Sequence, residues 1–261
     1  MKTKPTTLFV NPLNFVQACR GFRRRGAAAL VAFGLAALAA PAGAAMLLQV
    51  DFQQTQNPHP TETGYQAFEV TNAGVAGPQT RAFGSYGVTV TNGYTVDGSG
   101  YLNATGLVNA RYRAGNPPDS GAFTYSDLYT DFVTNGADTG LQLTGFDVNT
   151  AYTVTFYAFD YSNTRTQTFR DITGGTNVLL GSIAWTASTT PTSNGQYSLT
   201  ATVTTDSLGR MTIRANGASG TTVINGLQVA SIPEPSTVML TGLGLVVVLR
   251  TCRRSRGSLA L

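Results

Sequence analysis

Apolar and polar residues alternate along the middle of the chain, and this period of two limits the possible folds more than any other feature. The alternation is clearest over residues 152–159 and 197–204. Successive side chains of a strand point to opposite faces of a sheet, so both segments are predicted strands. Further strands are expected at 47–52, 87–92, 141–148, 178–184 and 223–229, and from Met211 onward after a turn at 206–209.

No part of this middle stretch shows the spacing and capping of an amphipathic helix. Many short strands separated by Gly- and Asn-rich turns are typical of a sandwich or jelly roll. We therefore expect one all-β domain, a jelly-roll β-sandwich, over residues 45–230. Cys19 and Cys252 lie outside it, so the domain has no disulfide and depends on its core for stability.

The charge of the chain is unevenly distributed. Ten of its 17 basic residues lie in the first 25 residues or after residue 249. Residues 46–230 hold seven arginines, no lysine and twelve acidic residues, a net charge of −5. A nucleic-acid-binding domain needs positive charge on its folded surface. Because this domain is acidic, nucleic acid is not an expected partner.

The N-terminal segment, residues 1–44, has the features of a secretory signal peptide. Three arginines at 23–25 precede an apolar run over 27–40, and small residues follow at Ala42 and Ala44. This order predicts a signal read by the Sec export machinery and cleaved after Ala44 or, as second choice, one residue later. A retained membrane anchor is the alternative, although the apolar run is short for a membrane span.

The C-terminal segment, residues 231–261, combines three parts in order. They are a Pro-Glu-Pro motif, an apolar run and an arginine cluster: Pro233, Glu234, Pro235; 238–249; Arg250, Arg253, Arg254. About 13 helical residues extend roughly 20 Å, against about 30 Å for the hydrocarbon core, so the run predicts a short transmembrane helix. Arginines kept on the cytoplasmic side would leave the domain outside.

This arrangement resembles the PEP-CTERM sorting signal of Gram-negative bacteria. The resemblance implies processing by an exosortase near the Pro-Glu-Pro motif, after transient anchoring in the inner membrane. It also implies delivery to the cell envelope, the outer surface or an extracellular polysaccharide matrix. The apolar residues 257–261, beyond the arginines, depart from the family pattern. An uncleaved C-terminal anchor is the alternative.

A second resemblance covers residues 46–230. It rests on four segments in order: 50–52 (Val-Asp-Phe), 111–133 with its Arg-Tyr-Arg start, 152–160, and 224–227 (Ile-Asn-Gly-Leu). They look like the galactose-binding-like jelly-roll domains of polysaccharide esterases and lyases, and like malectin-type carbohydrate modules. The resemblance implies a β-sandwich that often binds sugar and sometimes holds a structural calcium ion. It carries no ligand residue over to this chain.

Titratable groups suited to catalysis are scarce in the domain. His59 is its only histidine, and no Gly-x-Ser-x-Gly motif accompanies it. One histidine without cysteine cannot form a closed zinc site. Calcium accepts carboxylate oxygens, and Asp119, Asp127 and Asp131 are candidate ligands, although they lack calcium-loop spacing. We therefore expect no enzyme activity and no cofactor, with structural calcium left open.

Arg111 and Arg113 share one face of an extended segment, and Asp131 is their nearest expected ion-pair partner. One interpretation is a structural ion pair that holds the long irregular segment 109–126 in place. Alternatively, an arginine fork can bond sugar hydroxyls while an aromatic ring stacks on the pyranose. The candidate ligand-binding residues are Arg111, Tyr112, Arg113, Tyr129, Asp131 and Trp185, with core packing as the alternative for the aromatic ones.

These features predict an exported surface or matrix protein without catalytic activity, with extracellular polysaccharide as its candidate partner. A purely structural surface protein is the first alternative, and a glycan-modifying hydrolase is the second.

Overall fold

The structure is a computed structural model that describes residues 43–57, 59–70 and 74–233. Most of the predicted signal peptide and the sorting segment from Glu234 onward lie outside these residues. Residues Ala44–Ile232 form one compact unit. Within the described ranges, no helix has the length and apolar character needed to cross a membrane.

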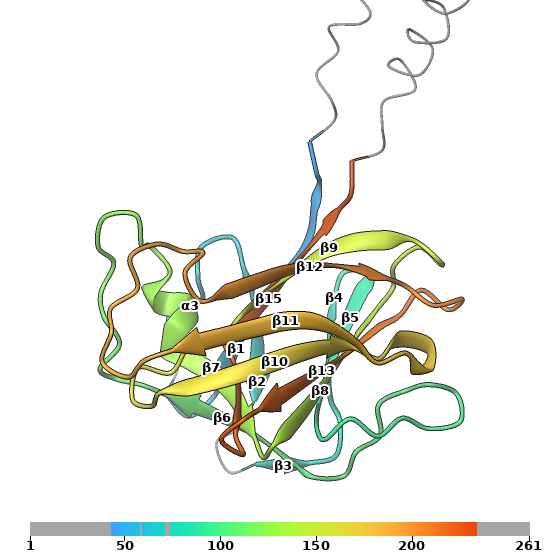
Figure 1. Cartoon of the computed structure of the whole chain (residues 1–261), viewed down its shortest axis with the longest axis horizontal. Coiled ribbons are helices and arrows are strands. Elements are labelled where there is room, and N and C mark those ends of the chain that lie inside the picture. Colours follow the sequence, from blue (N-terminus) through green and yellow to red (C-terminus); the bar gives the residue numbers. More distant parts are fainter. Residues whose placement is uncertain (1–42, 58, 71–73, 234–261) are drawn as a thin grey trace, which may run out of the picture. The chain divides into compact units, whose positions relative to one another are not determined.

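The chain forms three sheets of mainly antiparallel strands (Figure 1). The first sheet has the order β12 (Ser198–Thr204), β9 (Ala151–Tyr157), β15 (Gly226–Ser231), β1 (Met46–Gln54), β2 (Gln66–Val70). The second has the order β11 (Val178–Trp185), β10 (Arg165–Asp171), β13 (Met211–Gly217), β8 (Asp138–Thr144), β5 (Tyr86–Asn92), β4 (Gln79–Phe83). The third has the order β14 (Thr222–Ile224), β7 (Asp131–Asn135), β6 (Leu107–Tyr112), β3 (Val75–Ala76).

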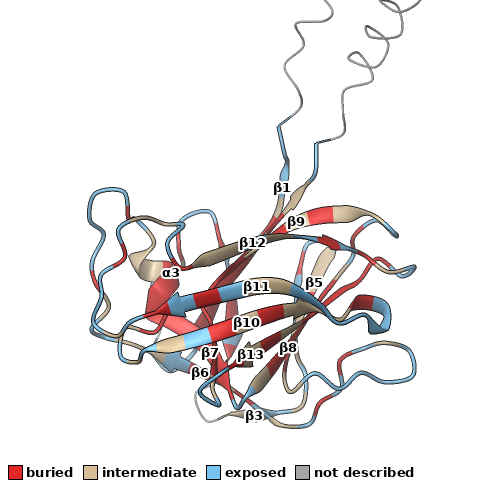
Figure 2. Cartoon of the chain, viewed as in Figure 1, coloured by how far each residue is buried: buried red, intermediate tan, exposed pale blue. Residues whose placement is uncertain are grey.

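The first two sheets pack face to face as a sandwich. Phe156 of β9 stacks on Phe169 of β10 with ring centroids 4.7 Å apart, and Phe68 of β2 meets Phe83 of β4 at 6.4 Å. Burial alternates along these strands, and Figure 2 shows the buried residues concentrated in the strands. The all-β sandwich expected from the period-two pattern is therefore confirmed.

The predicted strands are present, with several differences. The strand expected over 141–148 ends at Thr144 of β8, and β2, β3, β4, β6, β7 and β10 were not predicted. The segment 223–229 is divided into β14 and β15 by Asn225, which is fully buried. Its side-chain amide donates to the carbonyl of Asp131 (2.9 Å), and its oxygen accepts the N–H of Phe159 (2.6 Å). A short helix, α3 (Ser126–Thr130), is also present where no helix was expected.

Strand β1 runs through the first sheet and connects two regions of the domain. Its first residue, Met46, pairs with Ala230 of β15, and the backbone N–H of Ser231 donates to the carbonyl of Ala45 (2.9 Å). The two ends of the domain are therefore neighbours. Gln54 ends this nine-residue strand, roughly 26 Å from Met46 at about 3.3 Å per residue.

Replacing Phe156 by alanine is expected to lower the free energy of unfolding by about 3–5 kcal/mol, because it opens a cavity between the two sheets. Thr155→Ala is the matched control, since Thr155 points to the opposite face and its hydroxyl bonds only the exposed Thr200 hydroxyl. Its effect should stay within about 0.5 kcal/mol. Urea denaturation measures both; equal effects would contradict the assignment of the buried face.

Candidate functional site

Strand β6 has one edge that is only partly covered. On one side it pairs with β7 along residues 109–112, and on the other side β3 pairs only with Leu107 and Val108. Beyond that point, no strand of the described chain covers the second edge. The side-chain amide of Gln54 reaches this edge and donates to the carbonyl of Ala110 (3.3 Å). The edge and its flanking side chains form the candidate site.

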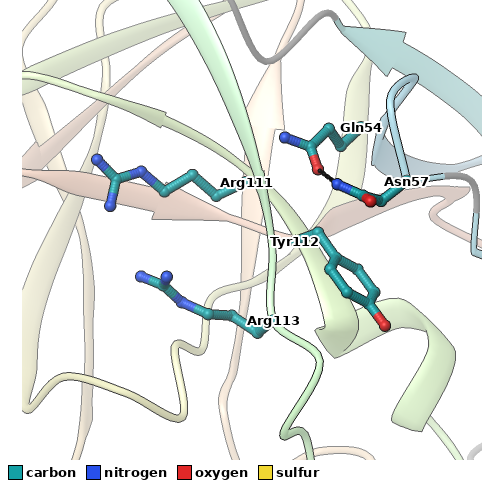
Figure 3. A pocket seen from close by; sticks show the side chains of 5 residues that line it. All are labelled: Gln54, Asn57, Arg111, Tyr112 and Arg113. Carbon is teal, nitrogen blue, oxygen red and sulfur yellow. Dashed lines mark hydrogen bonds between the residues drawn. The ribbon is translucent and has the colours of Figure 1, made fainter.

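An open groove of about 340 Å³ lies along this part of β6, lined by Gln54, Asn57, Arg111, Tyr112 and Arg113. Figure 3 shows the two arginines extending to one side of the strand and Tyr112 to the other, as the period of two requires. Asn57 donates its side-chain amide to Gln54 (2.9 Å). The groove therefore offers a ring, the exposed amide of Asn57 and guanidinium groups, while Gln54 is buried at its floor.

Two further hollows adjoin this groove. One, of about 290 Å³, shares Arg111 with it and is also lined by Asn109, Thr134, Asn135 and Thr221. The other, of about 160 Å³, shares Tyr112 and Arg113 and extends to His59, Ala114, Asn116, Pro117, Pro118, Ser126, Asp127 and Thr130. The three hollows therefore form a row along β6, which we call the β6 groove.

Arg113 is held in place by Asp160, which corrects the expected pairing with Asp131. Its guanidinium donates to both carboxylate oxygens of Asp160, at 2.9 and 3.2 Å, and lies over the ring of Phe132, 5.3 Å from the centroid. Burial alone would raise the pKa of Asp160. Hydrogen bonds from Arg113, Asn163 and the backbone of Ser162 outweigh burial and lower that pKa. Asp160 is therefore an ionised anchor.

Arg111 differs from its neighbour because it is exposed and uncommitted. Among the residues that the structure describes, four arginine–aspartate ion pairs form and none includes Arg111. Likewise, the side-chain hydrogen bonds that arginines donate in the described part of the chain all come from arginines other than Arg111. The predicted side-by-side placement of Arg111 and Arg113 on one face is present, but only Arg113 is paired.

Two predicted aromatic candidates lie away from the groove. Tyr129 is fully buried, stacked on Phe123 with ring centroids 5.8 Å apart and packed against Phe159 at 5.5 Å. Trp185 of β11 is 3% exposed, so its ring is not available to a sugar. Both residues therefore pack in the core, which was the alternative to a role in sugar binding.

The candidate calcium ligands do not assemble into a metal site. Asp119 accepts the backbone N–H of Ser126 (3.1 Å), and Asp127 lies 3.3 Å from Nδ1 of His59. Asp131 is buried instead, with both carboxyl oxygens lacking a hydrogen-bond partner. Within the described ranges, no three His, Cys, Asp or Glu side chains come together as a metal-binding group. The three predicted ligands are therefore not brought together at one site in the described part of the chain.

Asp131 has an acidic neighbour in Asp51 of β1. Asp51 is fully buried; one of its oxygens accepts from the backbone of Glu62 (2.9 Å) and the side chain of Gln53 (3.1 Å), and the other has no partner. Burial raises the pKa of Asp51 to about 7, and the charge of Asp131 adds to this effect. Burial also raises the pKa of Asp131 to about 7.

Gln54 and Asn57 were not predicted as site residues. Gln54 ends a buried strand and Asn57 follows in the adjoining turn. Neutral amides in such positions carry no sequence signal for binding, since turns favour Asn for backbone reasons alone. Only the approach of β1 to β6 reveals their place in the groove.

The raised pKa values of Asp51 and Asp131 predict that stability falls as pH rises. The folded state holds these protons up to about pH 7, while unfolded carboxyls lose them near pH 4. The unfolded state therefore binds fewer protons between these values. The free energy of unfolding should decrease there by up to about 1.4 kcal/mol per pH unit for each proton.

Asp51→Asn should flatten this pH dependence and stabilise the domain at pH 8. Glu69→Gln is the control, because it neutralises an exposed acid on β2. Urea denaturation between pH 4 and 9 measures the slopes. A slope in Asp51→Asn identical to that of the unchanged protein would contradict the assignment.

The sequence matches no protein-family model, and it matches no curated protein. Solved structures give distant likenesses. The ANX2 ectodomain from Arabidopsis thaliana is 10% identical and superposes with a TM-score of 0.38. The match covers 57% of this chain and 52% of the ectodomain. CBM35 from Paenibacillus barcinonensis is 18% identical, with 56% and 93% covered and a TM-score of 0.29.

A carbohydrate-binding module of the Cellvibrio mixtus lichenase 5A, solved with cellotriose, is 14% identical, with 48% and 87% covered and a TM-score of 0.28. This chain thus spans about half the length of the ANX2 ectodomain. Likeness at these scores carries no argument about ligand or activity, so the functional reading rests on the β6 groove.

Proposed function

We propose that this chain is an exported surface protein that binds polysaccharide in the β6 groove and does not modify it chemically. The observation that carries the proposal is the open groove lined by Gln54, Asn57, Arg111, Tyr112 and Arg113. We also propose that the β-sandwich is a jelly roll of the galactose-binding-like or malectin-like type.

The groove has the chemical groups that sugars need. The ring of Tyr112 is partly exposed and offers an apolar surface for a pyranose face. The exposed amide of Asn57 can donate and accept hydrogen bonds, which suits hydroxyl groups, and the buried Gln54 holds it in place. The salt bridge to Asp160 fixes Arg113 in advance, so less side-chain entropy is lost on binding. A polar, preorganised, open groove suits an extended chain of sugars.

Binding without catalysis fits the distribution of carboxylates. Glycoside hydrolysis uses two carboxyl groups that flank the scissile bond. Of the residues lining the three hollows of the β6 groove, Asp127 alone is acidic. Asp51 and Asp131 lie close enough to interact, but both are buried and outside the lining. This arrangement supports the proposal of a binding protein over that of a hydrolase.

Export and sorting are proposed from the two terminal segments. The strands begin at Met46 and end at Ser231, just inside the predicted cleavage point after Ala44 and the motif at Pro233–Glu234–Pro235. The β6 groove, at the Gln54 end of β1, lies roughly 26 Å from the paired domain ends. A domain attached through those ends would present the groove away from the attachment point.

An assembly role without a ligand is the second candidate. Strand β11 is an edge of the second sheet, and its residues Val178 and Leu179 are each 56% exposed. An edge strand with exposed apolar residues can pair with a second copy. Self-association through β11 together with no polysaccharide binding would favour this role.

Tyr112→Ala should weaken polysaccharide binding about tenfold, equivalent to about 1.4 kcal/mol, because the stacking surface is lost. Tyr94→Ala is the matched control, since Tyr94 is exposed but lines none of the three hollows. Affinity electrophoresis of the purified full-length protein across a polysaccharide panel measures both. Equal retardation of the two variants and the unchanged protein on every binding polysaccharide would count against the groove.

The mature protein in a Gram-negative host is expected to begin at Ala45 or Met46 and to end near Pro233–Glu234–Pro235. Mass spectrometry of the envelope or matrix fraction measures both termini directly. Glu234→Ala is expected to leave the C-terminal segment attached if an exosortase reads the motif. An intact chain recovered from the cytoplasm would contradict export altogether.

A further inference from the structure

We propose that the β6 groove selects an extended anionic polysaccharide, one that carries sugar carboxylates, and that Arg111 binds the carboxylate. This inference rests on the proposed function and names its substrate class. The first argument comes from charge. Residues 46–230 carry a net charge of −5, yet the linings of the two hollows that share Arg111 contain two arginines and no acidic residue.

The two arginines do not contribute equally to that local charge. The charge of Arg113 is balanced by Asp160, whose carboxylate it meets with two hydrogen bonds. Arg111 has no such partner among the described residues, so its positive charge faces the groove uncompensated. A guanidinium presents two parallel N–H donors that match a carboxylate. Arg111 is therefore the group that would distinguish an acidic sugar from a neutral one.

The position of Arg111 argues for a chain over a single sugar. It stands between the hollows of about 340 and 290 Å³ and lines both. A carboxylate bound there would have neighbouring sugars on each side. The exposed Asn57 offers an amide to one side, and the partly exposed Asn109 offers one to the other. The amides of Gln54 and Asn135 are buried and hydrogen-bonded within the protein, so they shape the two hollows. The anionic group would thus lie inside a polymer, with hydroxyl-bearing sugars along β6.

The opposite end of the row has different chemistry. The hollow of about 160 Å³ contains Asp127, which would repel a second carboxylate close by. His59 lines the same hollow, with its Nδ1 3.3 Å from Asp127. The preference for an anion is therefore assigned to the Arg111 side of the groove.

The test compares polygalacturonate with its fully methyl-esterified form, because esterification removes the negative charge and keeps the sugar backbone. Alginate and a panel of neutral polysaccharides extend the comparison. The purified full-length protein is expected to bind at least one acidic polymer, with binding that weakens as sodium chloride is raised. Arg111→Gln should weaken that binding roughly 10- to 100-fold, as expected for a lost hydrogen bond to a charged group.

Two controls separate the charge effect from folding and from overall charge. Arg170→Gln removes one positive charge from β10, outside the hollows, and should leave binding unchanged. Thermal unfolding of Arg111→Gln should match that of the unchanged protein, because Arg111 is exposed and no described side chain depends on it.

Each other outcome identifies which claim fails. Equal binding to acidic and esterified polymers, binding confined to neutral polysaccharides, or no effect of Arg111→Gln would overturn the anionic preference and leave the proposed function standing. Binding to no polysaccharide in the panel would overturn both.

Discussion

Burial of apolar faces between the two larger sheets is the interaction on which the rest of the structure depends. Residues 46–230 contain no cysteine, so no covalent cross-link supplements the core. Stacked rings such as Phe156 and Phe169 join the sheets from inside. Because β1 lies within one of these sheets, the sandwich also fixes where Gln54 meets β6. Packing of the core therefore determines the geometry of the groove.

Buried polar groups then define local positions that apolar packing leaves open. Asp160 and Asp131 are the same residue type with opposite pKa shifts. Arg113 stabilises the ionised form of Asp160, while Asp131 is buried without a cationic partner among the described residues and favours its neutral form. Asn225 joins β7 to the segment after β9 through hydrogen bonds to Asp131 and Phe159. These contacts hold the strands that border the groove.

An exposed strand edge is a risk for aggregation as well as an opportunity for binding. The partly covered edge of β6 carries Arg111, and a charged residue on an edge discourages pairing with another chain. The Gln54 amide occupies one carbonyl of the same edge. In the proposed function, the uncompensated charge that protects this edge also attracts the ligand. Under that proposal, Arg111 serves both stability in solution and recognition.

The sequence by itself determined the all-β class, most strand positions and the net negative charge of the domain. It also placed Arg111 and Arg113 on the same face of one strand. A period of two follows from strand geometry, so it can be read locally. Only the tertiary structure decided that Arg113 pairs with Asp160, 47 residues away, and that Trp185 and Tyr129 are buried. It alone brought Gln54 and Asn57 beside Tyr112. Alternation reveals that a strand has two faces, but which face is covered depends on strands distant in sequence.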